Sequence, residues 1–93
     1  MNASFRDRAT ARLFAREGGG RWGPDIERSA LRKLRLLDAA TRLEDLRALP
    51  GHRLEKLAGR RAGQWSIRVN ERFRVCFLWT GADAEDVEIV DYH

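Results

Sequence analysis

The stretch from Gln64 to Trp79, QWSIRVNERFRVCFLW, restricts the fold of this chain more than any other part of the sequence. Its apolar side chains alternate with polar ones, which predicts a β-hairpin with one buried face. A two-residue loop would place charged residues opposite apolar ones, whereas a three-residue loop over 70–72 places Ile67 opposite Val75. The sequence therefore predicts the three-residue loop.

This register also places Arg68 directly opposite Arg74 on the other face of the hairpin. Two like charges in a cross-strand pair destabilise a sheet unless an anion lies between them. The pair therefore indicates an anion-binding face. The alternative interpretation is that one face of the sheet is simply solvated, since arginines are ordinary on such a face.

The last seven residues, VEIVDYH, predict a further strand beside the hairpin. If the apolar face continues with Phe77 opposite Ile89, then Tyr92 lies opposite Arg74. We expect a row of three side chains across the polar face, formed by Arg68, Arg74 and Tyr92. Asp91 and His93 are expected beside this row at the end of the strand. Acids, phenols and imidazoles are the groups with which enzymes move protons.

The first half of the chain has helical periodicity instead. Pro24 suits the first position of a helix, and apolar residues follow it at helical spacing as far as Leu37. A shorter helix is expected within Ser4–Glu17, and Thr41 and Glu44 have the spacing of a capping box for a third. Helices followed by strands predict an α+β fold in which N-terminal helices pack on a small antiparallel sheet.

Charge and length restrict the function further. Lys and Arg number 18 against 14 acids, and most of these cations are arginine, which gives a net charge of +4 and an isoelectric point of about 10.2. Guanidinium groups bind phosphate through paired hydrogen bonds, so a nucleic-acid partner is favoured over generic solubility as the explanation. A coding bias towards arginine stays open as the alternative. With 93 residues, we expect a single domain over 1–93.

Several other kinds of site are not predicted. Cys76 lies in an apolar strand and is expected to be a buried structural thiol, and His52 follows a Pro-Gly turn and is expected to be a solvated loop residue. Neither a zinc-ligand spacing nor a nucleotide-binding loop is present in the sequence. The chain has no apolar run of membrane-spanning length, so a cytoplasmic protein is expected.

Two segments together resemble a known family. PGHRLEKLAGRRAGQWSIRVNERFRVCFLW, Pro50–Trp79, and VEIVDYH, Val87–His93, are similar to the HigB branch of the RelE/ParE toxin superfamily. The first half is similar only in layout, with two helices before the sheet and a short strand that Ser4–Arg6 would supply. The resemblance implies a RelE-like fold and a bacterial type II toxin, an endoribonuclease that cuts mRNA on the ribosome.

The resemblance also implies partners and no cofactor. A helix-turn-helix, HigA-like antitoxin would hold the toxin inactive, and operator DNA would be bound only through the antitoxin complex. The 2′-hydroxyl of the RNA attacks the neighbouring phosphorus when a base takes its proton and cations hold the phosphate, so neither a metal nor a cofactor is needed.

Individual roles follow from the same resemblance. Arg74 would contact the scissile phosphate, and Asp91, Tyr92 and His93 would form the terminal catalytic group, with His93 as the general acid. Where some relatives have a His and a Lys, this chain has Glu55 and Ala58, so the general base stays open between Glu55 and other groups. Four further residues are expected to contact RNA: Arg53, Arg68, Asn70 and Arg72.

A second function stays open at this point. The ParE branch of the superfamily resembles the same fold but acts as a non-catalytic inhibitor that binds DNA gyrase. A binding inhibitor does not need the Asp-Tyr-His terminus, so that terminus favours the ribonuclease.

Overall fold

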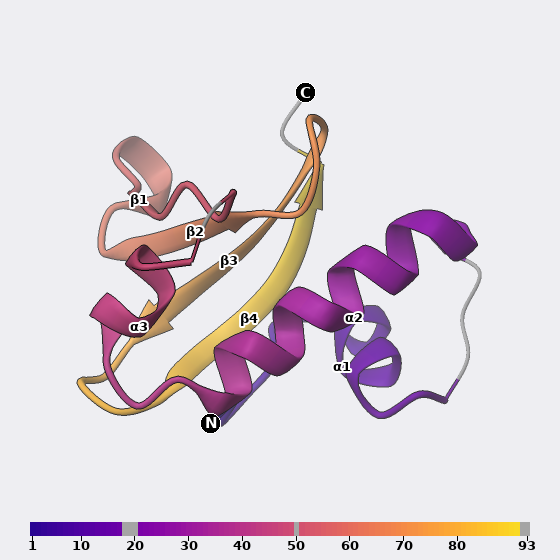
Figure 1. The fold of residues 1–93 in the computed structure, drawn as a ribbon, viewed down its shortest axis with the longest axis horizontal. Helices are drawn as coiled ribbons and strands as arrows, with labels where there is room; N and C mark the ends of the chain where they lie inside the picture. Colours follow the sequence, from indigo (N-terminus) through magenta and orange to yellow (C-terminus); the bar gives the residue numbers. More distant parts are fainter. Residues whose placement is uncertain (18–20, 50, 92–93) are drawn as a thin grey trace.

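The computed structural model describes residues 1–17, 21–49 and 51–91 of the chain. Helices come first and strands follow, as expected for an α+β fold (Figure 1). The described elements, in chain order, are α1 (Arg8–Phe14), α2 (Pro24–Ala39), α3 (Leu43–Arg47), β1 (Glu55–Lys56), the 3₁₀ turn η1 (Gly59–Arg61), β2 (Gln64–Arg68), β3 (Phe73–Trp79) and β4 (Ala84–Asp91).

The strands form one antiparallel sheet in the order β1-β2-β3-β4. The hairpin of β2 and β3 has the expected register, with Ile67 opposite Val75 and Arg68 opposite Arg74. The Val69 N–H donates to the Phe73 carbonyl at 2.9 Å and closes the turn. The like-charge pair predicted from the alternation of faces is therefore confirmed.

The predicted register of β4 is wrong by two residues. Ile89 lies opposite Val75 rather than Phe77, so Arg74 faces Val90 and not Tyr92. A shift of two keeps the same side chains on the same face, which is why the apolar pattern did not exclude it. The β3–β4 connection sets the register instead, because the Thr80 N–H donates to the Asp83 carbonyl at 2.9 Å and closes a short turn.

A β-bulge adjusts β4 beyond that turn. Asp86 and Val87 together oppose Phe77, since the pairing changes between Cys76 and Leu78. Asp86 has φ of +50°, a left-handed conformation that Asp tolerates better than most residues. The bulge lets both Ala84 and Val87 point into the core.

Helix α2 supplies the helical side of that core. Pro24 occupies the first turn, as predicted, and Ala30, Leu34 and Leu37 are fully buried. They pack with Phe77 and other apolar residues of the sheet, so one face of the sheet is covered by helices (Figure 1). None of the helices in the described ranges is long and apolar enough to cross a membrane.

The third helix is capped differently from the prediction. Asp45, not Glu44, accepts the backbone N–H groups of Thr41 and Arg42, each at 3.1 Å. These hydrogen bonds hold the pKa of Asp45 below its ordinary value. Arg42 therefore stands at the N-cap and the helix begins one residue later than a Thr41–Glu44 box would place it.

The N-terminal segment runs parallel to β4 at the edge of the sheet. Isolated bridges join Asn2 to Ala84 and Phe5 to Val87, so Ser4–Arg6 lies beside the sheet as expected but without a full strand. The Asn2 side-chain amide donates to the Leu34 carbonyl at 3.0 Å. This contact ties the chain start to α2.

The expectation for His52 is also wrong, because its side chain is buried rather than solvated. Neither ring nitrogen has a hydrogen-bond partner among the residues that the structure describes, and burial lowers the pKa of the imidazole, with Lys33 and Arg32 lowering it further. The Leu46 carbonyl comes near enough to oppose this shift in part, but it falls short of hydrogen-bond geometry. His52 is therefore a neutral core residue.

This burial predicts a pH-dependent stability. The unfolded chain binds a proton at His52 near pH 6.5, whereas the folded chain does so only at lower pH, so the free energy of unfolding falls as the pH drops below about 6.5. The slope approaches at most about 1.4 kcal/mol per pH unit. Urea denaturation between pH 5.5 and 7.5 measures it, and His52→Leu should flatten the profile. Equal slopes in the two chains would contradict a neutral buried imidazole.

Candidate active site on the open face of the sheet

The face of the sheet turned away from α1 and α2 carries the polar side chains of the hairpin. We call this surface the open face; its residues are Ser66, Arg68, Arg74, Cys76, Glu88 and Val90. They alternate along the strands with the core residues Ile67, Val75 and Ile89. The predicted anion-binding residues Arg68 and Arg74 therefore lie on the side of the sheet opposite α1 and α2. The name refers to this side of the sheet and not to exposure, because Ser66, Arg74 and Cys76 are buried.

Arg74 is the centre of this face, although only 8% of the residue is exposed. Its Nε donates to Ser66 Oγ at 2.8 Å, and its Nη2 donates to the Arg53 carbonyl at 2.6 Å. Nη1 lies 3.9 Å from Glu55 Oε1, a long ion pair to a half-exposed carboxylate. Two neutral acceptors thus hold the guanidinium in place, and its ion pair with Glu55 is long.

The Arg53 carbonyl that accepts the hydrogen bond from Arg74 lies in a loop with an unusual backbone conformation. Arg53 has φ of +46°, an unfavourable conformation for a residue with a side chain. The preceding carbonyl, of His52, accepts the Arg68 N–H at 2.6 Å and fixes the loop against the end of β2. The side chain of Arg53 is exposed beside the site.

Arg68 and Asn70 complete the neighbouring turn. Arg68 is half-buried opposite Arg74, and its Nε donates to the Asn70 carbonyl at 3.1 Å. The Asn70 side-chain oxygen accepts the backbone N–H groups of Arg72 and Phe73, each at 2.8 Å. This oxygen therefore braces the turn, so Asn70 has a structural role beside any contact with RNA.

Arg72 and Asp91 meet where β4 approaches the hairpin turn. The Nε and Nη2 atoms of Arg72 donate to Asp91 Oδ2 at 3.0 and 2.7 Å, and these bonds raise the pKa of Arg72. The guanidinium also lies over the Phe73 ring, 5.3 Å from its centroid. Asp91 thus stands at the strand end as predicted, whereas Tyr92 and His93 lie outside the described residues.

A second ion pair closes the other end of the face. Arg61 of η1 reaches across the sheet to Glu88 at 2.7 Å and to the Gln64 side chain at 3.0 Å. Cys76 is fully buried, as predicted, and burial raises the pKa of its thiol. A buried thiol of raised pKa is not a nucleophile.

The structure therefore brings three predicted residues next to a fourth, Arg74: they are Arg53, Glu55 and Arg68. The sequence interpretation missed Ser66. Its position could have been found, because Ser66 precedes Arg68 by two residues and is the diagonal neighbour of Arg74 on the same face. Among the residues that the structure describes, no group of three His, Cys, Asp or Glu side chains could hold a metal ion.

Comparison with known proteins agrees with this geometry. Residues 3–93 match the family described as the RelE-like toxin of the type II toxin-antitoxin system HigB. The chain belongs to the HigB-like toxin family. The fold and family expected from the two segments are therefore confirmed.

Two relatives of this family illustrate the match. Toxin HigB-1 of Vibrio cholerae serotype O1 is 40% identical over 80 residues, which cover 85% of this chain and 84% of the relative. Endoribonuclease HigB of Proteus vulgaris is 32% identical over 94 residues, which cover the whole of both chains. The similarity thus includes the helical half, for which the sequence alone indicated only a common layout.

The hydrogen bond between Ser66 and Arg74 leads to a prediction about the stability of the fold. Ser66→Ala removes the acceptor of Nε and leaves a buried donor of a charged group without its partner, which should reduce the free energy of unfolding by about 1–3 kcal/mol. Ser29→Ala, at a half-buried position on α2, is the matched control and should change it by less than about 0.5 kcal/mol. Chemical denaturation of both variants measures the difference, and equal effects would show that Ser66 does not hold Arg74.

Proposed function

We propose that this HigB-like toxin is an endoribonuclease that cleaves mRNA on the ribosome, with the 2′-hydroxyl of the RNA as the nucleophile. The observation that carries the proposal is the guanidinium of Arg74, buried on the open face and held by Ser66 and the Arg53 carbonyl. A relative over the full length is named an endoribonuclease, which favours cleavage over gyrase inhibition.

Electrostatics explain why a fixed guanidinium suits this reaction. Attack of the 2′-hydroxyl concentrates negative charge on the phosphate oxygens, and a donor that is already oriented stabilises that charge without reorganising. Arg74 is oriented by two hydrogen bonds and Arg68 stands opposite it in the sheet. Arg53, Asn70 and Arg72 lie in the adjoining loops, where they would contact the RNA on either side of the scissile phosphate.

Proton transfer needs a base and an acid in addition. Glu55 is the base we propose, because its exposed carboxylate lies beside Arg74, where the phosphate would bind. His93 is the proposed acid for the leaving 5′ oxygen, since imidazole titrates near neutral pH, and Tyr92 and Asp91 would orient the reacting groups.

A type II toxin is stored with an antitoxin. We propose a helix-turn-helix, HigA-like protein as this partner, with operator DNA bound only through the complex. The net charge of +4 favours an acidic contact surface on the antitoxin. Both proteins would act in the cytoplasm, where ribosomes and mRNA are found.

Arg74→Lys tests the phosphate site. Lysine keeps the positive charge but cannot make the two directed hydrogen bonds of the guanidinium, so cleavage should slow by about 10²- to 10³-fold. Primer-extension mapping of mRNA ends after brief induction measures it, with thermal melting as the check on folding. Arg47→Lys, on the exposed surface of α3, is the control and should cleave at the wild-type rate. Unchanged cleavage by a folded Arg74→Lys protein would show that the guanidinium of Arg74 is not needed for cleavage.

The chain terminus has its own test. Deletion of His93 removes the proposed acid beyond the last apolar residue, so the protein should fold while cleavage falls by about 10²- to 10⁴-fold. His93→Gln keeps the terminal carboxylate in place and should show the same loss, without the decline of the wild-type rate above neutral pH. Full-rate cleavage by either folded variant would assign the proton transfers to Tyr92 and Glu55.

A further inference from the structure

The backbone of the loop over residues 51–53 binds both arginines at the centre of the open face. The His52 carbonyl accepts the Arg68 N–H at 2.6 Å, and the Arg53 carbonyl accepts a hydrogen bond from Arg74 Nη2 at 2.6 Å. The loop presents these two carbonyls with Arg53 at φ of +46°, a conformation that a residue with a side chain does not favour by itself. Contacts outside the loop therefore hold it in this conformation.

The side chain of His52 supplies such a contact. Only 1% of the residue is exposed, and the ring lies where Lys33 of α2 and the Leu46 carbonyl of α3 act on it. A side chain packed this closely fixes the backbone that carries it. We propose that His52 is a positioning residue for the phosphate site and that it holds Arg74 in place only while its imidazole is neutral. This rests on the proposed function, in which Arg74 binds the scissile phosphate.

Histidine is an unfavourable choice for packing alone at this position. Neither ring nitrogen has a hydrogen-bond partner within the described part of the chain, and buried polar atoms without partners destabilise a fold. A leucine would fill the same space without that cost. What histidine adds is a side chain whose charge can change close to neutral pH.

The surroundings of the ring oppose its protonation. Burial lowers the pKa of His52, and Lys33 and Arg32 of α2, both cations, lower it further. From α3, the Leu46 carbonyl opposes this shift only in part. A proton on the ring would add a positive charge beside these two cations in a place without water. The imidazolium is therefore more stable outside the core, in a state in which the loop has moved.

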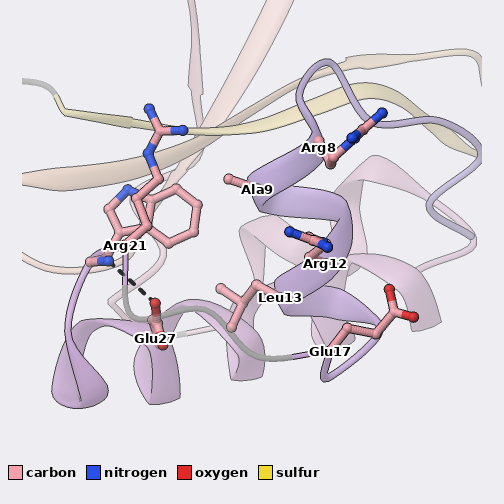
Figure 2. Close-up of a pocket in the computed structure, with 8 residues that line it drawn as sticks. Arg8, Ala9, Arg12, Leu13, Glu17, Arg21 and Glu27 are labelled. Atoms are coloured by element: carbon pink, nitrogen blue, oxygen red, sulfur yellow. Dashed lines mark hydrogen bonds between the residues drawn. The ribbon is translucent and has the colours of Figure 1, made fainter.

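The contact between α1 and the start of α2 shows the opposite arrangement of charges. Figure 2 shows three arginines there around a hollow that two glutamates share: Arg8, Arg12, Arg21, Glu17 and Glu27. Cations in that hollow thus have carboxylates close by, whereas the two charged residues that act on His52 are both cations. A protonated His52 would be repelled rather than paired.

Movement of the loop would reach the phosphate site through its two carbonyls. The Arg68 N–H would lose the His52 carbonyl, and Arg74 Nη2 would lose the Arg53 carbonyl, while Ser66 still accepts from Nε. A guanidinium held at one point only can turn away from the geometry that the transition state needs. Cleavage would therefore stop in mild acid before the protein unfolds.

NMR spectra of ¹⁵N-labelled protein, recorded from about pH 7.5 to about pH 4.5, test this without RNA. Two signals report the loop, namely the backbone amide of Arg68 and the Nη2 protons of Arg74. The amides of Ile67 and Val75 report the hairpin. His52→Leu is the test variant, because leucine is apolar and does not titrate. His93→Gln is the control, because it removes the other histidine of the chain.

In the wild type, both loop signals should change with a midpoint below pH 6.5 and at higher pH than the hairpin signals. The Arg68 amide proton should shift upfield as its hydrogen bond lengthens, and the Arg74 Nη2 signals should merge as rotation becomes free. His93→Gln should titrate like the wild type. His52→Leu should keep both loop signals in place until the protein unfolds.

Two outcomes would overturn the proposal: simultaneous change of the loop and hairpin signals in the wild type, or the same titration of the loop signals in His52→Leu. Neither outcome depends on catalysis, because no RNA is present. Failure of the proposed ribonuclease function would instead be detected in the cleavage assay with Arg74→Lys, and it would leave these signals unchanged.

Discussion

The guanidinium of Arg74 is a permanent charge held almost out of water, and much of the surrounding structure serves to satisfy it. Removing an ion from water costs several kcal/mol unless good hydrogen bonds replace its hydration. Ser66 supplies one acceptor from the diagonal position on β2, and the Arg53 carbonyl supplies another from a strained loop. The preceding residue, His52, has a buried side chain, and its carbonyl accepts the Arg68 N–H. His52 and Arg53 therefore connect the buried core to the hydrogen bonds around Arg74.

Two ion pairs flank the pair of arginines Arg68 and Arg74. Arg72 is neutralised by Asp91 at the hairpin end, and Arg61 is neutralised by Glu88 at the other. Between these pairs stand Arg68 and Arg74, opposite each other in the sheet, and Arg74 has a long contact of 3.9 Å with Glu55. The phosphate of the proposed substrate would bind between these two ion pairs, beside Arg68 and Arg74.

The alternation of apolar and polar residues predicted the register of the hairpin but not that of β4. Alternation within the hairpin was decisive, because a shift of one residue would have exposed Ile67 and buried Arg68. The same pattern could not fix the register of β4, because a shift of two residues leaves each side chain on the same face of the sheet. The bulge at Asp86 could not be predicted either, because no pattern of apolar residues marks it. His52 was misassigned because its burial depends on packing between α2 and α3, which no local pattern encodes. Within the site, Ser66 was missed although the predicted register already made it the diagonal neighbour of Arg74 on the same face.

The ion pair between Glu55 and Arg74 bears on the proposed mechanism. The Glu55 carboxylate is 54% exposed and lies 3.9 Å from the guanidinium of Arg74, so the ion pair between them is long and weak. A phosphate carries more acceptor oxygens and can bind the guanidinium in a bidentate manner, which makes it the stronger partner. Arrival of RNA would therefore displace Glu55 from Arg74. In the mechanism proposed above, the displaced carboxylate would then stand beside the phosphate, within reach of the 2′-hydroxyl whose proton it would take.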